Sequence, residues 1–163
     1  MEAKFPFRKV LVYLDGSEGS MSAAMYAILL AKSSSSQLHA LYCVNTKALG
    51  DLVKARIFVS QEKNEYLADL NKDAHRHIRH IEKLAASKDL TVSSVIVEGS
   101  PNAEVSRYIK ENKIDLLVLG SVNMIRSRRE ELTSETDRML RTSTCPVLVC
   151  RDDDAVWQMF EEL

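Results

Sequence analysis

The chain has 163 residues, of which 45% are hydrophobic, so it has the usual size of one domain and can bury a substantial core. Its 22 basic and 23 acidic side chains are interspersed and give a formal net charge of -1, which argues against nucleic acid or anionic lipid as a partner. No window approaches the roughly 18 consecutive apolar residues of a membrane span, and the first residues lack the apolar core of a secretion signal, so we expect a cytoplasmic protein without a membrane partner.

The N-terminal part of the sequence predicts a strand, a sharp turn and a helix. Residues 10–14 form an apolar run that is too short for a helix and rich in strand formers, as expected for a strand covered on both faces. Asp15-Gly16-Ser17 ends this run. From Ser20 to Ala31 apolar residues recur every three or four positions, which predicts a helix that ends in the serine run at 33–36.

The middle of the chain predicts two more strands separated by a long helix. Residues 38–44 form a second apolar run, and residues 91–97 are rich in β-branched side chains, so both are expected to be strands. Between them, an apolar stripe from Leu67 to Ala85 predicts a helix that packs on a sheet. Residues 45–60 show no clear period and are expected to be an excursion that is partly helical.

The C-terminal half continues the alternation of strands and helices. Ser100-Pro101 predicts a helix start, with serine as N-cap and proline in the first turn. Residues 115–120 and 145–150 are apolar runs that predict the fourth and fifth strands, and a helical stripe from Leu132 to Ser143 lies between them. Such a β-α alternation predicts an α/β protein, with a parallel sheet between two layers of helices.

The last residues are expected to form a separate element. Residues 152–154 are three aspartates, after which apolar residues repeat at helical spacing. We therefore expect residues 1–151 to be one domain and residues 152–163 to be an acidic tail with a short amphipathic helix. This helix is expected to pack over the region of the fifth strand, with the sole tryptophan, Trp157, as its anchor.

Two predicted strand ends carry residues suited to anion binding. In an open parallel sheet the ligand site lies beyond the carboxyl ends of the strands, where the strand order reverses. The first strand ends in Asp15-Gly16-Ser17-Glu18-Gly19-Ser20, and the fourth is followed by Gly120-Ser121-Val122-Asn123, an arginine-rich loop and Thr133-Ser134. Glycine allows close approach of the backbone, and a helix start presents free N–H groups to an anion.

From Lys9 to Cys150 the sequence resembles the universal stress protein family. The stretches that carry the resemblance are Val10 to Ser20, Glu98 to Gly120, and Thr133 to Cys150, which ends in CPVLVC. The resemblance implies a three-layer α/β/α fold that is Rossmann-like and adenine nucleotide α-hydrolase-like, with five parallel strands in the order 3-2-1-4-5. It also implies a homodimer formed through the fifth strand, Val147 to Cys150, whose exposed edge would otherwise be a liability.

In the ATP-binding branch of that family the fourth strand ends in a motif of glycine, two residues, glycine, nine residues, glycine, and serine or threonine. Here the spacing is kept, but two of the three glycines are replaced. The resemblance, carried over position by position, implies that the site binds ATP with Mg²⁺. It implies that Asp15 lies near the ribose and adenine and that Val44 lies against the base. It also implies that the phosphates are surrounded by Gly120, Asn123, Thr133, Ser134 and Thr136.

The replacements leave a degenerate phosphate site. Asn123 tolerates left-handed backbone geometry comparatively well, whereas the β-branched Thr133 does not. Glu135 adds a carboxylate to the first turn of the following helix, where it would repel a polyphosphate. The arginines of the loop, Arg126, Arg128 and Arg129, would offset this charge if the loop folds inward, and otherwise they are a solvated loop.

Several of these residues have a purely structural alternative. Ser134 with Asp137 resembles a capping pair for the last helix, and Asp15 can brace the turn after the first strand.

His77 and His80 lie three residues apart on a helix, which allows a metal, but a solvated helix edge is the simpler interpretation. The three cysteines have neither disulfide-framework nor zinc-site spacing, so we expect reduced, buried thiols and no metal site.

For function, the resemblance implies a dimeric stress-response and regulatory module rather than an enzyme. The alternative is a nucleotide-binding protein with slow ATP hydrolysis, or an enzyme of the related adenine nucleotide α-hydrolase type. We find no set of nucleophile, general base and orienting group near the predicted strand ends. A receiver-like signalling domain is excluded, because Asp15 alone supplies the acidic cluster that such a domain needs.

Overall fold

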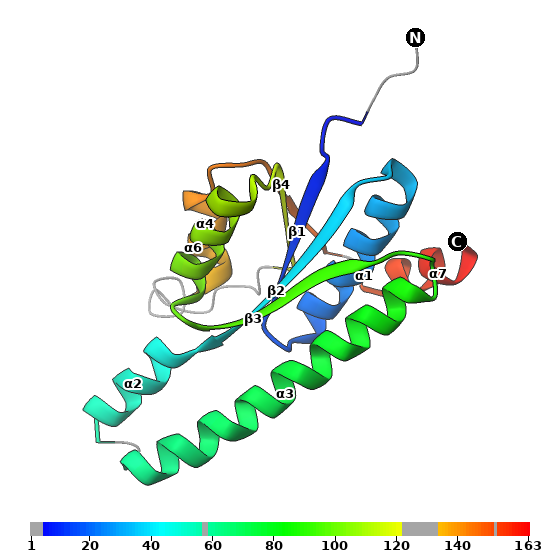
Figure 1. Ribbon diagram of the computed structural model, residues 1–163. Helices are drawn as coiled ribbons and strands as arrows, with labels where there is room; N and C mark the ends of the chain where they lie inside the picture. Colours follow the sequence, from blue (N-terminus) through cyan, green and yellow to red (C-terminus); the bar gives the residue numbers. More distant parts are fainter. Residues whose placement is uncertain (1–4, 57–58, 122–133, 152) are drawn as a thin grey trace.

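The computed structural model describes residues 5–56, 59–121, 134–151 and 153–163. A five-stranded sheet forms the middle layer, and helices cover both of its faces (Figure 1). All strand pairings are parallel, in the order β3-β2-β1-β4-β5, which confirms the expected fold class. The strands are β1 (Lys9–Leu14), β2 (Gln37–Asn45), β3 (Val92–Gly99), β4 (Leu116–Leu119) and β5 (Val147–Val149).

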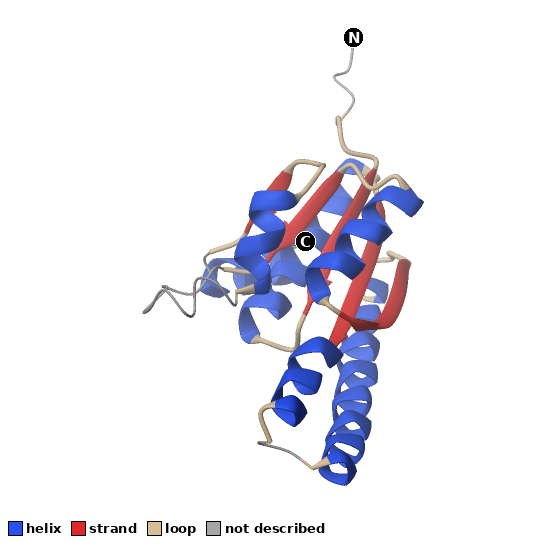
Figure 2. Cartoon of the chain, turned by 90° about the vertical axis from the view of Figure 1, so that its left-hand side faces the viewer, coloured by secondary structure: helices blue, strands red, loops and turns tan. Residues whose placement is uncertain are grey.

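The helices divide between the two faces and the carboxyl edge of the sheet. On one face lie α1 (Glu18–Ser34), α3 (Ser60–Ala86) and α7 (Asp153–Glu162), and on the other lie α4 (Pro101–Asn112) and α6 (Glu135–Thr142) (Figure 1). The predicted excursion contains α2 (Thr46–Lys54), which together with the first turns of α3 extends beyond the sheet (Figure 2). No helix in the described ranges is long and apolar enough to cross a membrane.

The central strands build two separate apolar clusters because their side chains alternate between the faces. Along β1, the side chains of Val10, Val12 and Leu14 pack toward α1 and α3. Leu11 and Tyr13 pack toward α4 and α6. The register from Lys9↔Gln37 to Leu14↔Tyr42 brings the ends of β1 and β2 to the same edge of the sheet, and β4 pairs on the other side of β1.

Helix α1 lies close to the sheet because its inner face is built from small residues. Ser17 is its N-cap, and the Ser17 side chain accepts a hydrogen bond from Ser20 N at 3.1 Å. The helix ends at Ser35, whose left-handed backbone (φ 56°) turns the chain toward β2. The alanines that are fully buried along this helix are Ala23, Ala24, Ala27 and Ala31.

The C-terminal helix α7 packs against α1, but not through its tryptophan. Val156 and Phe160 are buried in the same cluster as α1, and Lys88 Nζ lies 4.7 Å from the centre of the Phe160 ring. Trp157 is 48% exposed, so it does not anchor α7 to α1, and its predicted packing over the fifth-strand region stays a prediction. The physical reason is helical spacing: residues 156 and 160 share one face, and residue 157 points about 100° away from it. The division of the chain at residue 151 stays a prediction.

Candidate functional site

The end of β4 touches the start of α1 directly. A Cβ atom placed on Gly120 would lie 2.5 Å from both Gly19 C and Gly19 O, and 2.9 Å from Ser20 N. These are backbone atoms that cannot swing away, so only glycine fits at position 120. The close packing of β4 against α1 therefore explains why position 120 requires glycine, without any bound phosphate. The same contact brings the ends of β1 and β4 together, as predicted.

The turn after β1 is held by its own side chains. Asp15 Oδ1 accepts hydrogen bonds from Ser17 N (2.9 Å) and Ser17 Oγ (2.5 Å), and Ser20 Oγ donates to Ser17 O (2.9 Å). Gly16 has a φ of 83°, which favours glycine, and a Cβ there would lie 2.8 Å from the Tyr42 hydroxyl. Asp15 thus braces the turn, as the structural alternative predicted, while its side chain remains exposed at the strand end.

Ser134 is the N-cap of α6. Its Oγ accepts a hydrogen bond from Asp137 N at 3.2 Å, and the Asp137 carboxylate pairs with Arg141 Nε at 2.9 Å. Thr136 lies in the first turn of the same helix and is partly exposed. The capping role of Ser134 is therefore present, and the hydroxyl stands at a helix N-terminus, where free N–H groups favour an anion.

The carboxylate of Glu135 is turned toward α4. Glu135 Oε2 accepts a hydrogen bond from Asn102 N at 3.2 Å, and Arg138 lies 3.5 Å from Oε1. Ser100 occupies the predicted N-cap position of α4 but makes no side-chain cap hydrogen bond. Glu135 thus supplies the negative group at the positive end of α4 that the N-cap residue does not supply, and it ties α6 to α4.

Charges from both halves of the candidate site act on the buried Tyr13 hydroxyl. Burial raises the pKa of the Tyr13 hydroxyl, and the carboxylates of Asp15 and Glu135 raise this pKa further. Asp15 belongs to the turn after β1 and Glu135 to the start of α6. Both charges therefore act on one side chain at the carboxyl end of the sheet.

A second buried group, Cys43 on β2, is also affected by the carboxylate of Glu135. Burial, followed by the carboxylates of Glu104 and Glu135, raises the pKa of the Cys43 thiol to about 12. Its Sγ lies 3.8 Å from Gly99 O. The thiol stays protonated at neutral pH, so it is a weak nucleophile, and its surroundings on the α4 and α6 side are negative.

The Val44 side chain lies inside the protein. It is 3% exposed and belongs to the cluster on the α1 and α3 side, whereas Tyr13 and Cys43 belong to the opposite cluster. The main chain of Val44 lies at the end of β2, opposite Glu98 of β3.

Part of the predicted phosphate loop lies outside the described residues. This holds for Asn123 and Thr133, and for the arginines at 126, 128 and 129. Their roles remain predictions from the sequence.

Sequence reasoning missed three groups around the candidate site: Tyr13, Cys43 and Glu104. Alternation along a strand places Tyr13 on the same face as Asp15, and this signal was available in the sequence. Glu104 lies in the first turn of α4. In the structure its carboxylate also approaches Gly99, with Oε1 3.1 Å from where a Cβ on that glycine would lie.

Two of the histidines of α3, His75 and His77, make local contacts. His75 Nδ1 lies 2.7 Å from Asn71 O, and His77 Nδ1 lies 2.8 Å from Asp73 O. The His77 ring is tilted against Tyr42, with their centres 5.8 Å apart. Among the described residues no group of three or more His, Cys, Asp or Glu side chains could hold a metal ion.

Comparison with known proteins decides the family. A model of the Universal stress protein family matches residues 6–151, nearly the whole chain. The chain belongs to the universal stress protein family. Within it, the chain is 29% identical over 151 residues to universal stress protein YxiE of Bacillus subtilis, covering 89% of this chain and 99% of that protein. It is 26% identical over 146 residues to universal stress protein MJ0531 of Methanocaldococcus jannaschii, covering 89% and 82%.

Solved structures of universal stress proteins share the fold. The structure of protein MJ0577 of Methanocaldococcus jannaschii matches with a TM-score of 0.73 at 21% identity, covering 91% of this chain and 98% of that one. A universal stress protein of Arabidopsis thaliana with AMP bound matches with a TM-score of 0.63 at 17% identity, covering 91% and 94%. A universal stress protein in complex with cAMP matches with a TM-score of 0.59 at 23% identity, covering 89% and 97%.

Proposed function

We propose that this universal stress protein is a dimeric regulatory module of the stress response, not an enzyme, and that it binds an adenine nucleotide at the carboxyl ends of β1, β2 and β4. The observation that carries the proposal is the packing of β4 against α1 at Gly120, which brings the exposed Asp15 and the end of β4 to one edge of the sheet. The two structural relatives with AMP bound and in complex with cAMP support an adenine ligand for the same fold.

The described residues support a division of roles within this site. The exposed carboxylate of Asp15 meets the ribose, and the end of β2 meets the base through the main chain of Val44, because its side chain is buried. Gly120, Ser134 and Thr136 lie on the phosphate side, and the sequence adds Asn123 and Thr133. When ATP is bound, Mg²⁺ would accompany its phosphates.

The carboxylates of the site favour ligands with few negative charges. Glu135 and Glu104 both act on Cys43, and Asp15 and Glu135 both act on Tyr13. Each added phosphate charge must be accommodated in this negative surrounding, so binding becomes less favourable as the ligand gains charge. We therefore propose that the site binds AMP or cAMP in preference to ATP.

Calorimetric titration with adenosine, AMP, cAMP, and ATP with Mg²⁺ tests this proposal. The protein should bind AMP more tightly than ATP. Glu135→Gln should strengthen binding of ATP most and of AMP less, and should leave binding of uncharged adenosine nearly unchanged, because the removed charge acts on ligand charge. Asp137→Asn is the matched control: it removes a carboxylate from the same helical turn, but one that pairs with Arg141, and it should leave the order unchanged.

Two results of this titration contradict the proposal. If neither the parent protein nor Glu135→Gln binds any adenine compound, the site is absent. If ATP is turned over well above background, the module is an enzyme of the adenine nucleotide α-hydrolase type, and the regulatory interpretation fails.

We propose that the homodimer forms through β5. This strand is an edge of the sheet, and Leu148 on it is 39% exposed, whereas the matched residue of the paired strand, Val118 on β4, is fully buried. An exposed apolar edge strand is usually paired or covered. Leu148→Lys should therefore give monomers in sedimentation velocity, and Tyr66→Lys, which changes an exposed residue of α3, should leave the dimer intact. An unchanged dimer in Leu148→Lys would contradict this interface.

A further inference from the structure

The hydroxyl of Tyr13 is a polar group within the apolar layer under α4 and α6. Tyr13 is the second-to-last residue of β1, its side chain is 5% exposed, and it belongs to the same apolar cluster as Cys43 and Met139. No hydrogen bond joins its hydroxyl to any residue in the described ranges. A buried hydroxyl without a partner costs free energy unless water or a ligand reaches it.

The Tyr13 hydroxyl reaches the surface of the protein. Across the described part of the chain, no side-chain nitrogen or oxygen is both sealed from solvent and without a hydrogen-bond partner. Because the Tyr13 oxygen has no partner there, solvent must contact it. The core therefore holds the ring of Tyr13, while its oxygen is presented to whatever binds at this place.

Asp15 follows Tyr13 at the carboxyl end of the sheet. It is the first residue after β1, it is exposed, and alternation along the chain gives it the same side as Tyr13. Asp15 Oδ1 accepts both hydrogen bonds from Ser17, whereas no donor among the described residues reaches Oδ2. A tyrosine hydroxyl and a carboxylate oxygen at the same strand end thus lack a protein partner.

The surroundings of Tyr13 keep its hydroxyl protonated. Burial, followed by the carboxylate of Asp15, raises its pKa, so the group is an uncharged O–H at neutral pH. Glu135 acts in the same direction but less strongly, and Arg138 lies 3.5 Å from its carboxylate. Both carboxylates disfavour a phosphate beside Tyr13 and tolerate an uncharged ligand hydroxyl. A tyrosine hydroxyl can both donate to and accept from such a group.

A second tyrosine near Asp15, Tyr42 of β2, points to the other face of the sheet. It is 7% exposed and belongs to the cluster on the α1 and α3 side. Its oxygen lies 2.8 Å from where a Cβ on Gly16 would lie, and the ring of His77 packs against its ring with the centres 5.8 Å apart. The Tyr42 hydroxyl therefore packs against the turn after β1, away from the α4 and α6 side.

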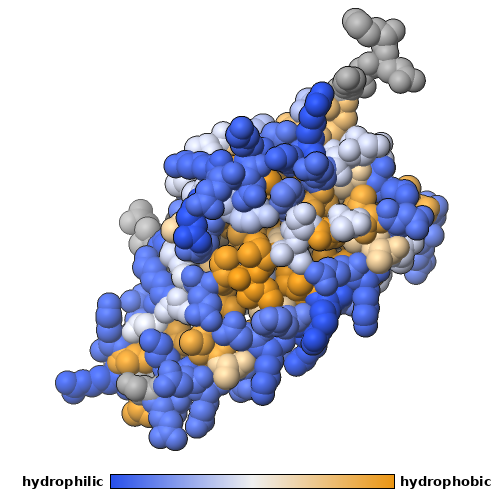
Figure 3. All heavy atoms as spheres, in the orientation of Figure 1, coloured by the Kyte–Doolittle hydropathy of each residue, from blue (hydrophilic) through white to orange (hydrophobic). Residues whose placement is uncertain are grey.

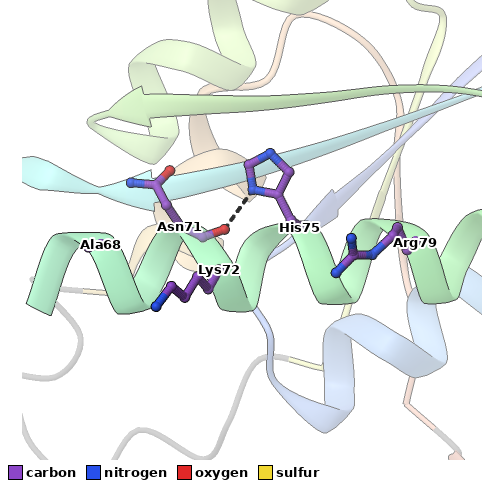
Figure 4. A pocket seen from close by; sticks show the side chains of 5 residues that line it. All are labelled: Ala68, Asn71, Lys72, His75 and Arg79. Atoms are coloured by element: carbon purple, nitrogen blue, oxygen red, sulfur yellow. Dashed lines mark hydrogen bonds between the residues drawn. The ribbon is translucent and has the colours of Figure 1, made fainter.

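Two features of the outer surface offer less to a polar ligand. A hollow of about 350 Å³ is formed by side chains of α3, which are Ala68, Asn71, Lys72, His75 and Arg79 (Figure 4). His75 Nδ1 there lies 2.7 Å from Asn71 O, so this ring is engaged within its own helix. Figure 3 shows apolar surface gathered in the middle of one molecular face, and such a surface supplies no hydrogen bonds that orient a ligand.

We propose that the Tyr13 hydroxyl forms a hydrogen bond with a ribose hydroxyl of the nucleotide and makes the site selective for ribonucleotides over deoxyribonucleotides. This inference rests on the proposed function, because it requires a nucleotide at the strand ends. A carboxylate binds ribose hydroxyls at the strand ends of Rossmann sheets, and Asp15 has that position here. The two hydroxyls of a ribose are adjacent, so one meets Asp15 and the other meets Tyr13.

Calorimetric titration with AMP, 2′-deoxy-AMP and 3′-deoxy-AMP tests the inference, because the three ligands carry the same charge. Tyr13→Phe keeps the ring and removes the hydroxyl. It should bind AMP about fivefold more weakly than the parent protein does, which is the effect of one neutral hydrogen bond. One of the two deoxy compounds lacks the hydroxyl that Tyr13 contacts, so the parent and Tyr13→Phe should bind that compound equally.

Tyr42→Phe is the matched control. It removes a buried tyrosine hydroxyl from the opposite face and should bind all three ligands as the parent does. Urea denaturation checks that both variants are folded. If Tyr13→Phe weakens all three ligands by the same factor, or leaves AMP binding unchanged, the inference is overturned and the proposed function stands. A parent protein that binds none of the three ligands would overturn both.

Discussion

The two faces of the sheet are built for different purposes. Toward α1, α3 and α7, the core is mainly aliphatic, and buried alanines let α1 lie close to the strands. Toward α4 and α6, the strands present Tyr13, His39 and Cys43, and burial is the largest cause of the pKa shift of each of these groups. The first face chiefly supplies stability. The second face carries Tyr13 and Cys43 near the carboxyl ends of their strands, where the charge of Glu135 acts on both, and we therefore place the ligand there.

The largest expected effect comes from breaking the contact that joins the two strand ends. Gly120→Ala forces a Cβ to within 2.5 Å of the Gly19 backbone, so β4 and α1 must separate. We expect a loss of about 4 kcal/mol in the free energy of unfolding, measured by urea denaturation. Ser121→Ala is the control and should cost little. A stable Gly120→Ala variant would show that the ends of β1 and β4 are not held together as described.

A smaller loss is expected on the α1 face, where α7 is anchored. Phe160→Ala removes a ring that is 7% exposed and should cost about 3 kcal/mol. Trp157→Ala removes the larger side chain but should cost less than about 1 kcal/mol, because Trp157 is half exposed. Urea denaturation of both variants decides the comparison. A greater loss for Trp157→Ala would restore the tryptophan as the anchor.

The smallest expected effect is a pH dependence that originates on the α4 face. His39 is buried beside Tyr108, with 2.8 Å between His39 Nδ1 and the Tyr108 hydroxyl, and burial followed by the charge of Lys9 lowers the pKa of His39 below its ordinary value of 6.5. As pH falls through 6.5, the unfolded chain takes up this proton before the folded chain does. His39 therefore contributes to the free energy of unfolding above pH 6.5, and this contribution is lost as the pH falls below 6.5.

Thermal denaturation between pH 7.5 and 5.0 measures this effect. The melting temperature should fall toward pH 5.0 in the parent protein, and the fall should be shallower in His39→Gln. The exposed His80→Gln serves as control and should keep the slope of the parent. Equal slopes in all three proteins would remove His39 as the source.

Much of the fold could be predicted from the sequence because short-range patterns determine it. The apolar runs located the five strands, and Ser100-Pro101 located the start of α4. The order of the strands came from the resemblance, since periodicity does not say which strands lie side by side. The segment 45–60 could be assigned only in part, because α2 keeps few buried side chains; Leu49 is one of them.

The site was harder to predict because it depends on contacts between distant segments. Gly120 matched a phosphate motif, yet its need for glycine follows from Gly19, about 100 residues earlier in the chain. Glu135 was expected to face a phosphate, but it accepts a hydrogen bond from Asn102 in α4. Trp157 was expected to anchor the tail as the sole tryptophan, whereas Val156 and Phe160 are the residues of α7 that pack against α1. In each case the residue's function depends on which other residues it contacts in the folded protein, and the residue type alone does not show this.

The central claim is that an adenine nucleotide binds at the strand ends on the α4 and α6 side. Titration of the ¹⁵N-labelled protein with AMP, followed by amide chemical shifts, tests it most directly. We expect saturable shifts at residues 15–19, at Val44 and at 120–121, with α7 and the first half of β3 unchanged. Shifts confined to other parts of the molecule, or no shifts at millimolar AMP, would contradict the account.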